Sequence, residues 1–354
     1  MLFPWESTLC VFKPPKNMQR LRLILYCIGT ALIIGSIAGI ALVFHISSFS
    51  KSSVFVTPPG KHFQIRMGQN LKTVSTNLQD KGIITNSFLF QMVVRFKGLD
   101  KKIQAGEYTF IGNVTPEQVI KKLVQGKVTL YKITIPEGYN IKETAQLIEE
   151  KGFCNAGKFV ALCHEKEYLE SFGLSADSLE GYLFPETYFF PKGTTCTQII
   201  SAMISRFNKS FPQEWDDRAK SLGLSRHDVV ILASIIEKET GSAPERPLIS
   251  SVFHNRLKKG MRLESDPTVI YGIKNFDGNI TRKHLRTPTP YNTYTMRGLP
   301  KGPIANPGKL SLKAALYPVT SPYLFFVSKK NGTHYFSKTV QEHNRAVKKY
   351  LLSR

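Results

Sequence analysis

The fold class follows from the segment IPEGYNIKETAQLIEEKG, residues 135–152. It begins with an extended run, turns at Gly138, and continues from Asn140 into a helical pattern that stops at Lys-Gly. An Asn side chain can cap the first turn of a helix, and Gly adopts the left-handed conformation that often ends one. The segment therefore predicts a strand, a turn and a helix, in that order.

The same pattern occurs earlier in the chain, in IRMGQNLKTVSTNLQDKG at residues 65–82. The two segments align without a gap, so that Gly68 matches Gly138 and Asn70 matches Asn140. A repeat of this kind predicts two strand-turn-helix units of the same design.

Two further elements are predicted between the copies. AGEYTF, residues 105–110, is typical of a strand, and VTPEQVIKKLVQGK, residues 114–127, predicts a helix that begins with a capping box between Thr115 and Gln118. These small βα units resemble LysM modules, which bind the amino sugars of peptidoglycan and chitin. A purely structural α+β subdomain is the alternative. We place the LysM-like subdomain at 61–130, and the second βα repeat with its connecting region at 131–200.

An apolar run at residues 23–44, LILYCIGTALIIGSIAGIALVF, is long enough to cross a bilayer as a helix. A cleaved signal peptide would have a shorter apolar core and a small-residue exit, and HISSFSK after the run offers neither. Basic residues outnumber acidic ones in segment 1–22, which the positive-inside rule places in the cytoplasm. We expect a single-pass anchor in the inner (cytoplasmic) membrane, a Ser- and Pro-rich linker at 45–60, and an extracytoplasmic, periplasmic-side domain beyond it.

The charge of the chain is strongly positive, with 48 Lys and Arg against 26 Asp and Glu and a formal net charge of +22. Such a balance is typical of nucleic-acid-binding proteins. An extracytoplasmic domain does not meet nucleic acid, so we expect no nucleic-acid partner and instead lipid head groups or an anionic cell envelope.

Cysteine and histidine spacing exclude two other classes of protein. The outer segment carries Cys154, Cys163 and Cys196, an odd number too widely spaced for a disulfide framework, which leaves buried thiols or one bridge as alternatives. The histidines lack the spacing of zinc ligands, so we expect neither a metal site nor a cofactor.

From about residue 197 the pattern becomes mainly helical, and one helix is apolar on nearly every side. It lies in SRHDVVILASIIEKETG, residues 225–241, where Ser225 and Asp228 form a start signal. A helix that is apolar all round is buried, so Glu237 and Glu239 at its end border the core. Residues two apart on a helix point apart, so at most one of them acts as an acid at a given bond.

Burial would raise the pKa of such a carboxyl and keep it protonated near neutral pH, as a general acid requires. A plain helix end with salt-bridged glutamates is the alternative. Near the C-terminus, PYLFFVSKK and THYFSK predict a hairpin across Asn331 and Gly332.

Two segments rich in turn-forming residues offer side chains for sugar binding. SDPTVIYG, residues 265–272, contains Ser265, Asp266 and Tyr271. The irregular segment 286–308 contains Tyr291, Asn292, Tyr294 and Asn306. Long irregular segments in compact domains are often functional, and aromatic faces with amide dipoles suit amino sugars. Turn formation is the alternative role of the same residues.

Four motifs together are similar to the MltG, or YceG-like, family of endolytic murein transglycosylases. They are LEGYLFPETYFFP (179–191), ILASIIEKET (231–240), SVFHNRLKKGMRLESDPTVIYG (251–272) and TPYNTYTMRGLPKGPIANPG (289–308). The resemblance covers about residues 60–350, with Glu186 and Lys301 standing where the family usually has Asp and Pro. It implies an α+β fold with an N-terminal transmembrane helix, the LysM-like subdomain, and a mixed α+β lytic transglycosylase catalytic domain at 201–354.

The resemblance also implies a reaction. The β-1,4 bond between N-acetylmuramic acid and N-acetylglucosamine is cleaved without water inside a nascent glycan strand of peptidoglycan, leaving a 1,6-anhydromuramoyl end and terminating elongation. Glu237 would be the single catalytic acid and then base, with Glu239 as a structural or neighbouring group that contributes to substrate binding. Peptidoglycan synthases would be partners in the membrane. A non-catalytic, membrane-anchored peptidoglycan-binding scaffold is the rival interpretation.

Overall fold

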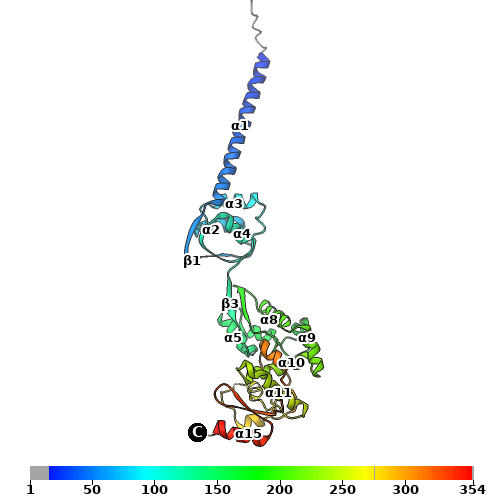
Figure 1. Ribbon diagram of the computed structural model, residues 1–354. Coiled ribbons are helices and arrows are strands. Elements are labelled where there is room, and N and C mark those ends of the chain that lie inside the picture. Colours follow the sequence, from blue (N-terminus) through cyan, green and yellow to red (C-terminus); the bar gives the residue numbers. More distant parts are fainter. Residues whose placement is uncertain (1–15, 275, 353–354) are drawn as a thin grey trace, which may run out of the picture. The chain divides into compact units, whose positions relative to one another are not determined.

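The computed structural model describes residues 16–274 and 276–352 (Figure 1). Most of the predicted cytoplasmic segment 1–22 and the last two residues of the predicted catalytic domain lie outside this part. The chain divides into two compact units, Met1–Thr129 and Leu130–Arg354, and each is described by itself.

The first unit begins with helix α1, Lys16–Lys51, which contains the predicted apolar run. Its residues Leu23–Lys51 are long and apolar enough to span a membrane, with a mean hydropathy of 2.3. The structure differs from the predicted linker at 45–60, because α1 continues to Lys51 and strand β1, Val54–Ile65, follows almost at once.

Two features account for the missing linker. Phe49 is buried in the core of the first unit, which holds the last turn of α1 against the folded domain. The prolines of this segment lie where the register of β1 shifts, between Val56 and Lys61. Proline is tolerated at such an irregularity because no ladder hydrogen bond is needed there.

The rest of the first unit packs three helices with one antiparallel pair of strands. Strand β1 pairs with β2, Gly106–Val114. The helices are α2 (Leu71–Asp80), α3 (Ser87–Phe96) and α4 (Pro116–Val124). The predicted caps are confirmed: Asn70 accepts a hydrogen bond from the backbone N–H of Thr73 at 2.8 Å, and Thr115 forms its capping box with Gln118.

The second unit begins with the second copy of the repeat. Strand β3, Leu130–Thr134, pairs antiparallel with β4, Thr187–Pro191, and Asn140 caps helix α5, Ile141–Glu150. The predicted strand-turn-helix design is therefore confirmed in both copies. A disulfide joins Cys154 to Cys196, which decides the alternative that the cysteine spacing left open. The helices around this sheet are α6 (Ala156–Leu162), α7 (Lys166–Ser171) and α8 (Cys196–Ser210).

Helix α10, Arg226–Glu239, lies at the centre of the larger hydrophobic core of this unit. The predicted capping box of Ser225 and Asp228 is present, and every residue of 229–236 is buried. α10 packs against α11 (Arg246–Lys258) and α14 (Lys309–Leu316). The remaining short helices before α14 are α9 (Gln213–Ser221), η1 (Ala243–Glu245), α12 (Asp266–Tyr271) and α13 (Arg282–Arg286).

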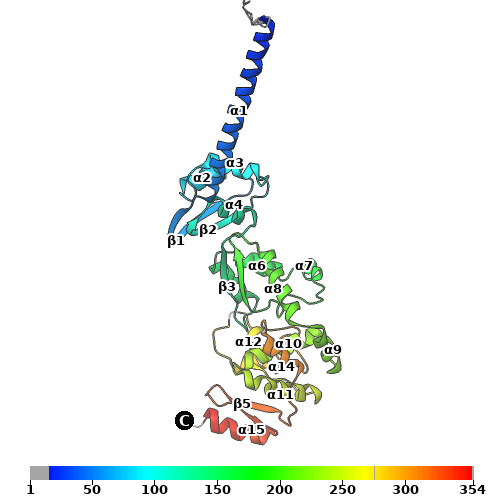
Figure 2. The same cartoon turned by 45° about the horizontal axis from the view of Figure 1, so that its top comes forward.

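The predicted C-terminal hairpin is confirmed as β5, Phe325–Ser328, and β6, His334–Ser337. Helix α15, Val340–Val347, packs on it and continues as the π-helical turn η2, Lys348–Leu352 (Figure 2). Each sheet within the described residues is a two-stranded antiparallel pair. Such strands, set among many helices, make the fold α+β, as predicted.

Candidate active site

The two glutamates at the end of α10 reach different surroundings. The side chain of Glu237 is only 5% exposed. Its Oε1 accepts a hydrogen bond from Nη2 of Arg246 at 2.9 Å, and its Oε2 accepts one from the backbone N–H of Gly308 at 2.9 Å. Since Arg246 is also buried, this contact is a buried ion pair that engages both carboxylate oxygens.

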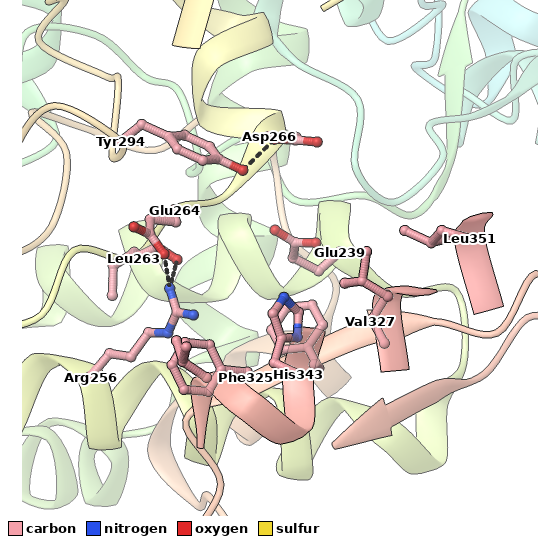
Figure 3. Close-up of a pocket in the computed structure, with 13 residues that line it drawn as sticks. Glu239, Arg256, Leu263, Glu264, Asp266, Tyr294, Phe325, Val327, His343 and Leu351 are labelled. Atoms are coloured by element: carbon pink, nitrogen blue, oxygen red, sulfur yellow. Dashed lines mark hydrogen bonds and ion pairs between the residues drawn. The ribbon is translucent and has the colours of Figure 1, made fainter. Parts of the chain in front are cut away.

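Glu239 instead faces a cavity of about 490 Å³ (Figure 3). Residues from the segment after α11, the irregular segment, the hairpin β5–β6 and the helix α15 complete its walls. Glu237 is not among the residues that line it. The cavity is therefore lined by Glu239, which the family resemblance implied to be a structural or neighbouring group.

Burial raises the pKa of the Glu239 carboxyl to about 7. A hydrogen bond donated by the Ser265 hydroxyl opposes this change, the negative charge of Asp266 adds to it, and the positive charge of Arg256 opposes it. Glu239 keeps some access to solvent through the cavity. A carboxyl in this state is partly protonated at neutral pH, so it can both donate and accept a proton.

Asp266 and Tyr294 form a hydrogen-bonded pair at the cavity wall. The Tyr294 hydroxyl donates to Oδ1 of Asp266 at 2.6 Å (Figure 3). Burial and this hydrogen bond raise the pKa of Tyr294, which keeps the phenol protonated. Although acidic side chains gather here, residues 16–274 and 276–352 hold no group of three or more His, Cys, Asp or Glu side chains arranged for a metal ion.

Arg256 supports the segment that carries Ser265. Its Nη1 donates to Oε2 of Glu264 at 3.1 Å and to the carbonyl of Leu263 at 2.9 Å, and its guanidinium lies 5.0 Å from the ring centroid of Phe325. Glu264 has a φ of 52°, a left-handed conformation that is unusual for a residue other than glycine. Such conformations persist where the surroundings enforce them, often at functional sites.

The helix α15 and the turn η2 supply one wall, through Val340, His343, Val347 and Leu351. The imidazole of His343 stacks on Phe325, with ring centroids 5.3 Å apart, and Figure 3 shows it directed toward Glu239. Its Nδ1 is buried and has no hydrogen-bond partner among the described residues. Burial and the charge of Arg256 lower the pKa of His343, against the opposing effect of Glu264, so a neutral imidazole faces the cavity.

Comparison with known proteins shows which family the chain resembles. The model of the YceG-like family matches residues 63–349. The chain belongs to the YceG-like family. An endolytic murein transglycosylase from Bacillus subtilis (strain 168) is 33% identical to it over 341 residues, which cover 91% of this chain and 92% of that protein.

Two further relatives extend the comparison of this YceG-like chain. An endolytic murein transglycosylase from Streptococcus pneumoniae (strain D39 / NCTC 7466) is 27% identical over 319 residues, and the match spans 58% of that longer protein. The crystal structure of a yceG-like protein from Listeria monocytogenes is 33% identical, with a TM-score of 0.56, and the match covers 84% of this chain and 99% of that one.

The YceG-like fold brings only part of the predicted sugar-binding set to the cavity. Asp266 and Tyr294 line the cavity. Ser265 does not line it but donates a hydrogen bond to Glu239. Tyr271 and Tyr291 lie elsewhere, packed edge to face with ring centroids 4.8 Å apart. The Tyr271 hydroxyl donates a hydrogen bond to Oε2 of the buried Glu180 at 3.0 Å.

The two predicted asparagine ligands have structural contacts instead. Asn292 is fully buried, and its Nδ2 donates to backbone carbonyls of the segment that precedes it, including that of Thr287 at 2.7 Å. Asn306 is also fully buried and joins the backbones of Tyr139, Gly181 and Leu183. Neither side chain lines the cavity. Turn formation, the alternative role, describes Asn292, whereas Asn306 holds together backbone segments that are distant in the chain.

Sequence reasoning missed the cavity residues Arg256, Phe325 and His343. They come from three elements that are far apart in the chain, so no local motif links them to Glu239. One signal was available: Val340, Val347 and Leu351 recur at helical spacing and predict an apolar face. An apolar helix face packs against another part of the protein, and in this structure it forms one wall of the cavity.

A second groove, of about 440 Å³, lies in the first unit. It is formed by the turn between β1 and α2, at residues 66–69, and by the loop before β2, at residues 100–105. This turn is the Gly-Asn part of the repeat, with Gly68 at a φ of 81°.

Asn306→Ala is expected to lower the free energy of unfolding by about 2–4 kcal/mol, because each buried N–H left without an acceptor costs about 1–3 kcal/mol. The Asn306 Oδ1 accepts from the N–H groups of Gly181 at 2.9 Å and Leu183 at 3.0 Å. Chemical denaturation measures the change. Asn344→Ala on the exposed face of α15 is the control, and equal stability of the two variants would contradict this role of Asn306.

Proposed function

We propose that this protein is a membrane-anchored endolytic murein transglycosylase that uses Glu239 as its catalytic acid and base. The observation that carries the proposal is the environment of Glu239, a carboxyl with a pKa raised to about 7 that faces a cavity. The relatives named endolytic murein transglycosylases support the reaction class.

The proposed reaction moves one proton out and one back. Protonated Glu239 donates its proton to the oxygen that bridges N-acetylmuramic acid and N-acetylglucosamine, and the C1–O4 bond breaks. The carboxylate then accepts the proton of the muramoyl C6 hydroxyl while O6 bonds to C1, which gives the 1,6-anhydro ring. Water is not consumed, so a second carboxylate is not needed to activate it.

Glu237, which the family resemblance implied as the catalytic acid, is less suited to this role. Both of its oxygens already accept hydrogen bonds, from Arg246 and from Gly308. A substrate oxygen would have to displace one of these donors, and Arg246 would then lose its closest carboxylate in a buried site. We therefore propose a structural role for Glu237 and transfer the catalytic role to Glu239.

Other cavity residues are proposed to hold the glycan. The Tyr294–Asp266 pair offers polar atoms for sugar hydroxyls, and the imidazole ring of His343 lines the cavity opposite Glu239. The groove of the first unit is proposed as an accessory glycan site of the LysM-like kind.

The proposed location rests on α1, the helix long and apolar enough to span a membrane. We propose that the basic N-terminal segment stays in the cytoplasm and that both units face outward, where glycan strands are made. Peptidoglycan synthases in the same membrane are the proposed partners.

The test uses the full chain in detergent with purified uncrosslinked glycan strands. Mass spectrometry should find new chains that end in 1,6-anhydromuramic acid, and hydrolytic ends would contradict the mechanism. A glycan-binding scaffold without activity, the rival function, would bind the strands and leave their lengths unchanged.

The rate is expected to fall as pH rises through about 7, approaching tenfold per pH unit, because the reaction needs the protonated Glu239 carboxyl. Ser265→Ala should move this alkaline limb to higher pH, since the Ser265 hydroxyl stabilises the ionised carboxylate. Rates measured from pH 5 to about pH 9 check both points. An unchanged profile in the variant would mean that Ser265 does not set the acidity of Glu239.

A further inference from the structure

The place where α1 enters the first unit sets how near that unit lies to the membrane. The uncharged run ends at Phe44, and Phe49 is already buried in the core formed with α3. Five helical residues advance only about 8 Å. If α1 spans the bilayer, the surface of the first unit around α1 therefore lies at the level of the lipid head groups.

A cleft of about 300 Å³ lies between the end of α1 and helix α3. Its apolar lining comes from Val43 and Ile46 of α1 and from Val93 and Phe96 of α3. Val43 belongs to the uncharged run itself, so Phe96 lies close to the boundary of the hydrocarbon layer. Figures 1 and 2 both show α3 beside this end of α1.

Helix α3 exposes large apolar side chains in addition to those that it buries. Phe90, Val93 and Val94 pack in the core, whereas Phe88 is 66% exposed and Phe96 is 84% exposed. Exposed aromatic residues at such a position are typical of elements that enter the interfacial layer of a membrane.

The end of the cleft that lies farther from the apolar run is positively charged. Lys51, at the end of α1, and Lys97, at the end of α3, line it together with Glu117. Lys97 pairs with Glu117 at 2.9 Å, and Lys51 and Lys121 also lie near enough to stabilise the charged form of that carboxylate. Three cations around one anion leave a net positive charge that attracts lipid phosphate.

We propose that the first unit docks on the outer leaflet through this α1–α3 surface, and that its cleft holds an anionic phospholipid of that leaflet. An acyl chain would lie against Val43, Ile46 and Phe96, and the phosphate would lie between Lys51 and Lys97. The inference rests on the proposed membrane anchor, and it adds a lipid site that the murein reaction does not require.

Tryptophan quenching tests the docking. The full chain is placed in nanodiscs whose phospholipids carry bromine on their acyl chains, and the wild-type signal of its two tryptophans is subtracted. Phe96→Trp should be quenched about twofold, as expected for a ring at the interfacial layer. The control is Met67→Trp, which is also highly exposed and lies just beyond the far end of β1, roughly 26 Å along the paired strand. Equal quenching of the two variants would overturn the proposal.

Native mass spectrometry tests the lipid site. The wild-type chain extracted from phosphatidylglycerol bilayers should keep a bound phosphatidylglycerol, and Lys51→Gln with Lys97→Gln should lose it. Lys72→Gln with Lys127→Gln changes the charge equally outside the cleft and should keep it. Retention by the first pair, or loss by both pairs, would refute a specific site. Because murein cleavage in detergent is measured separately, either result leaves the catalytic proposal independent.

Discussion

Glu239→Gln is expected to lower the rate of glycan cleavage by about 10²–10⁴-fold, the usual contribution of a general acid-base group. Glutamine keeps the size of the side chain and can still accept the Ser265 hydrogen bond, but it has no proton to donate to the bridging oxygen. The loss should therefore appear in kcat, with glycan binding and the melting temperature nearly unchanged. Formation of 1,6-anhydromuramoyl ends by mass spectrometry measures the rate.

Glu237→Gln is the matched control, because it makes the same chemical change two residues away on the same helix. It should keep most of the activity, since the amide oxygen can still accept from Arg246 or Gly308. The reverse pattern, with Glu237→Gln inactive and Glu239→Gln active, would restore the assignment that the family motif implied and would refute the one proposed from the cavity.

Glu237→Ala is expected to have the largest effect on stability, a loss of about 3–5 kcal/mol in the free energy of unfolding. The substitution leaves the guanidinium of Arg246 buried, with Glu137 at 3.6 Å as its remaining carboxylate. It also leaves the N–H of Gly308 without its acceptor. Denaturation by urea, followed by circular dichroism, measures the loss.

A double variant separates the ion pair from simple packing. Glu237→Leu combined with Arg246→Met removes both charges, so it should be more stable than Glu237→Ala. A double variant no more stable than Glu237→Ala would show that the pair is not the source of the effect. An unaltered midpoint for Glu237→Ala would remove the structural role proposed for this carboxylate.

The fold was most predictable where its signals are local. The Asn70 and Asn140 caps and the box at Ser225 each depend on residues within one helical turn, and the structure contains all of them. The prediction of a linker at 45–60 was wrong because the composition of this segment does not show that Phe49 is buried. Its burial depends on α3, which lies more than 35 residues further along the chain.

The site was less predictable for the same reason. Helix geometry shows that Glu237 and Glu239 point apart, but not what each one meets. Arg246, Gly308 and His343 decide that, and they come from α11, the irregular segment and α15. Asn306 was predicted as a sugar ligand but is fully buried. The amide of a loop asparagine can hydrogen-bond to a sugar or to the backbone, and the sequence does not show which until the burial of the side chain is known.

The bond between Cys154 and Cys196 bears on which side of the membrane the second unit occupies. Glutathione and thioredoxin keep thiols reduced in the cytosol of most bacteria, so a lasting sulfur–sulfur bond indicates an oxidising compartment. The excess of lysine and arginine in the N-terminal segment supports the same proposed orientation through the positive-inside rule. Two unrelated properties, the redox chemistry of the cysteines and the distribution of charge, thus favour the proposal that the second unit lies outside the cytoplasm.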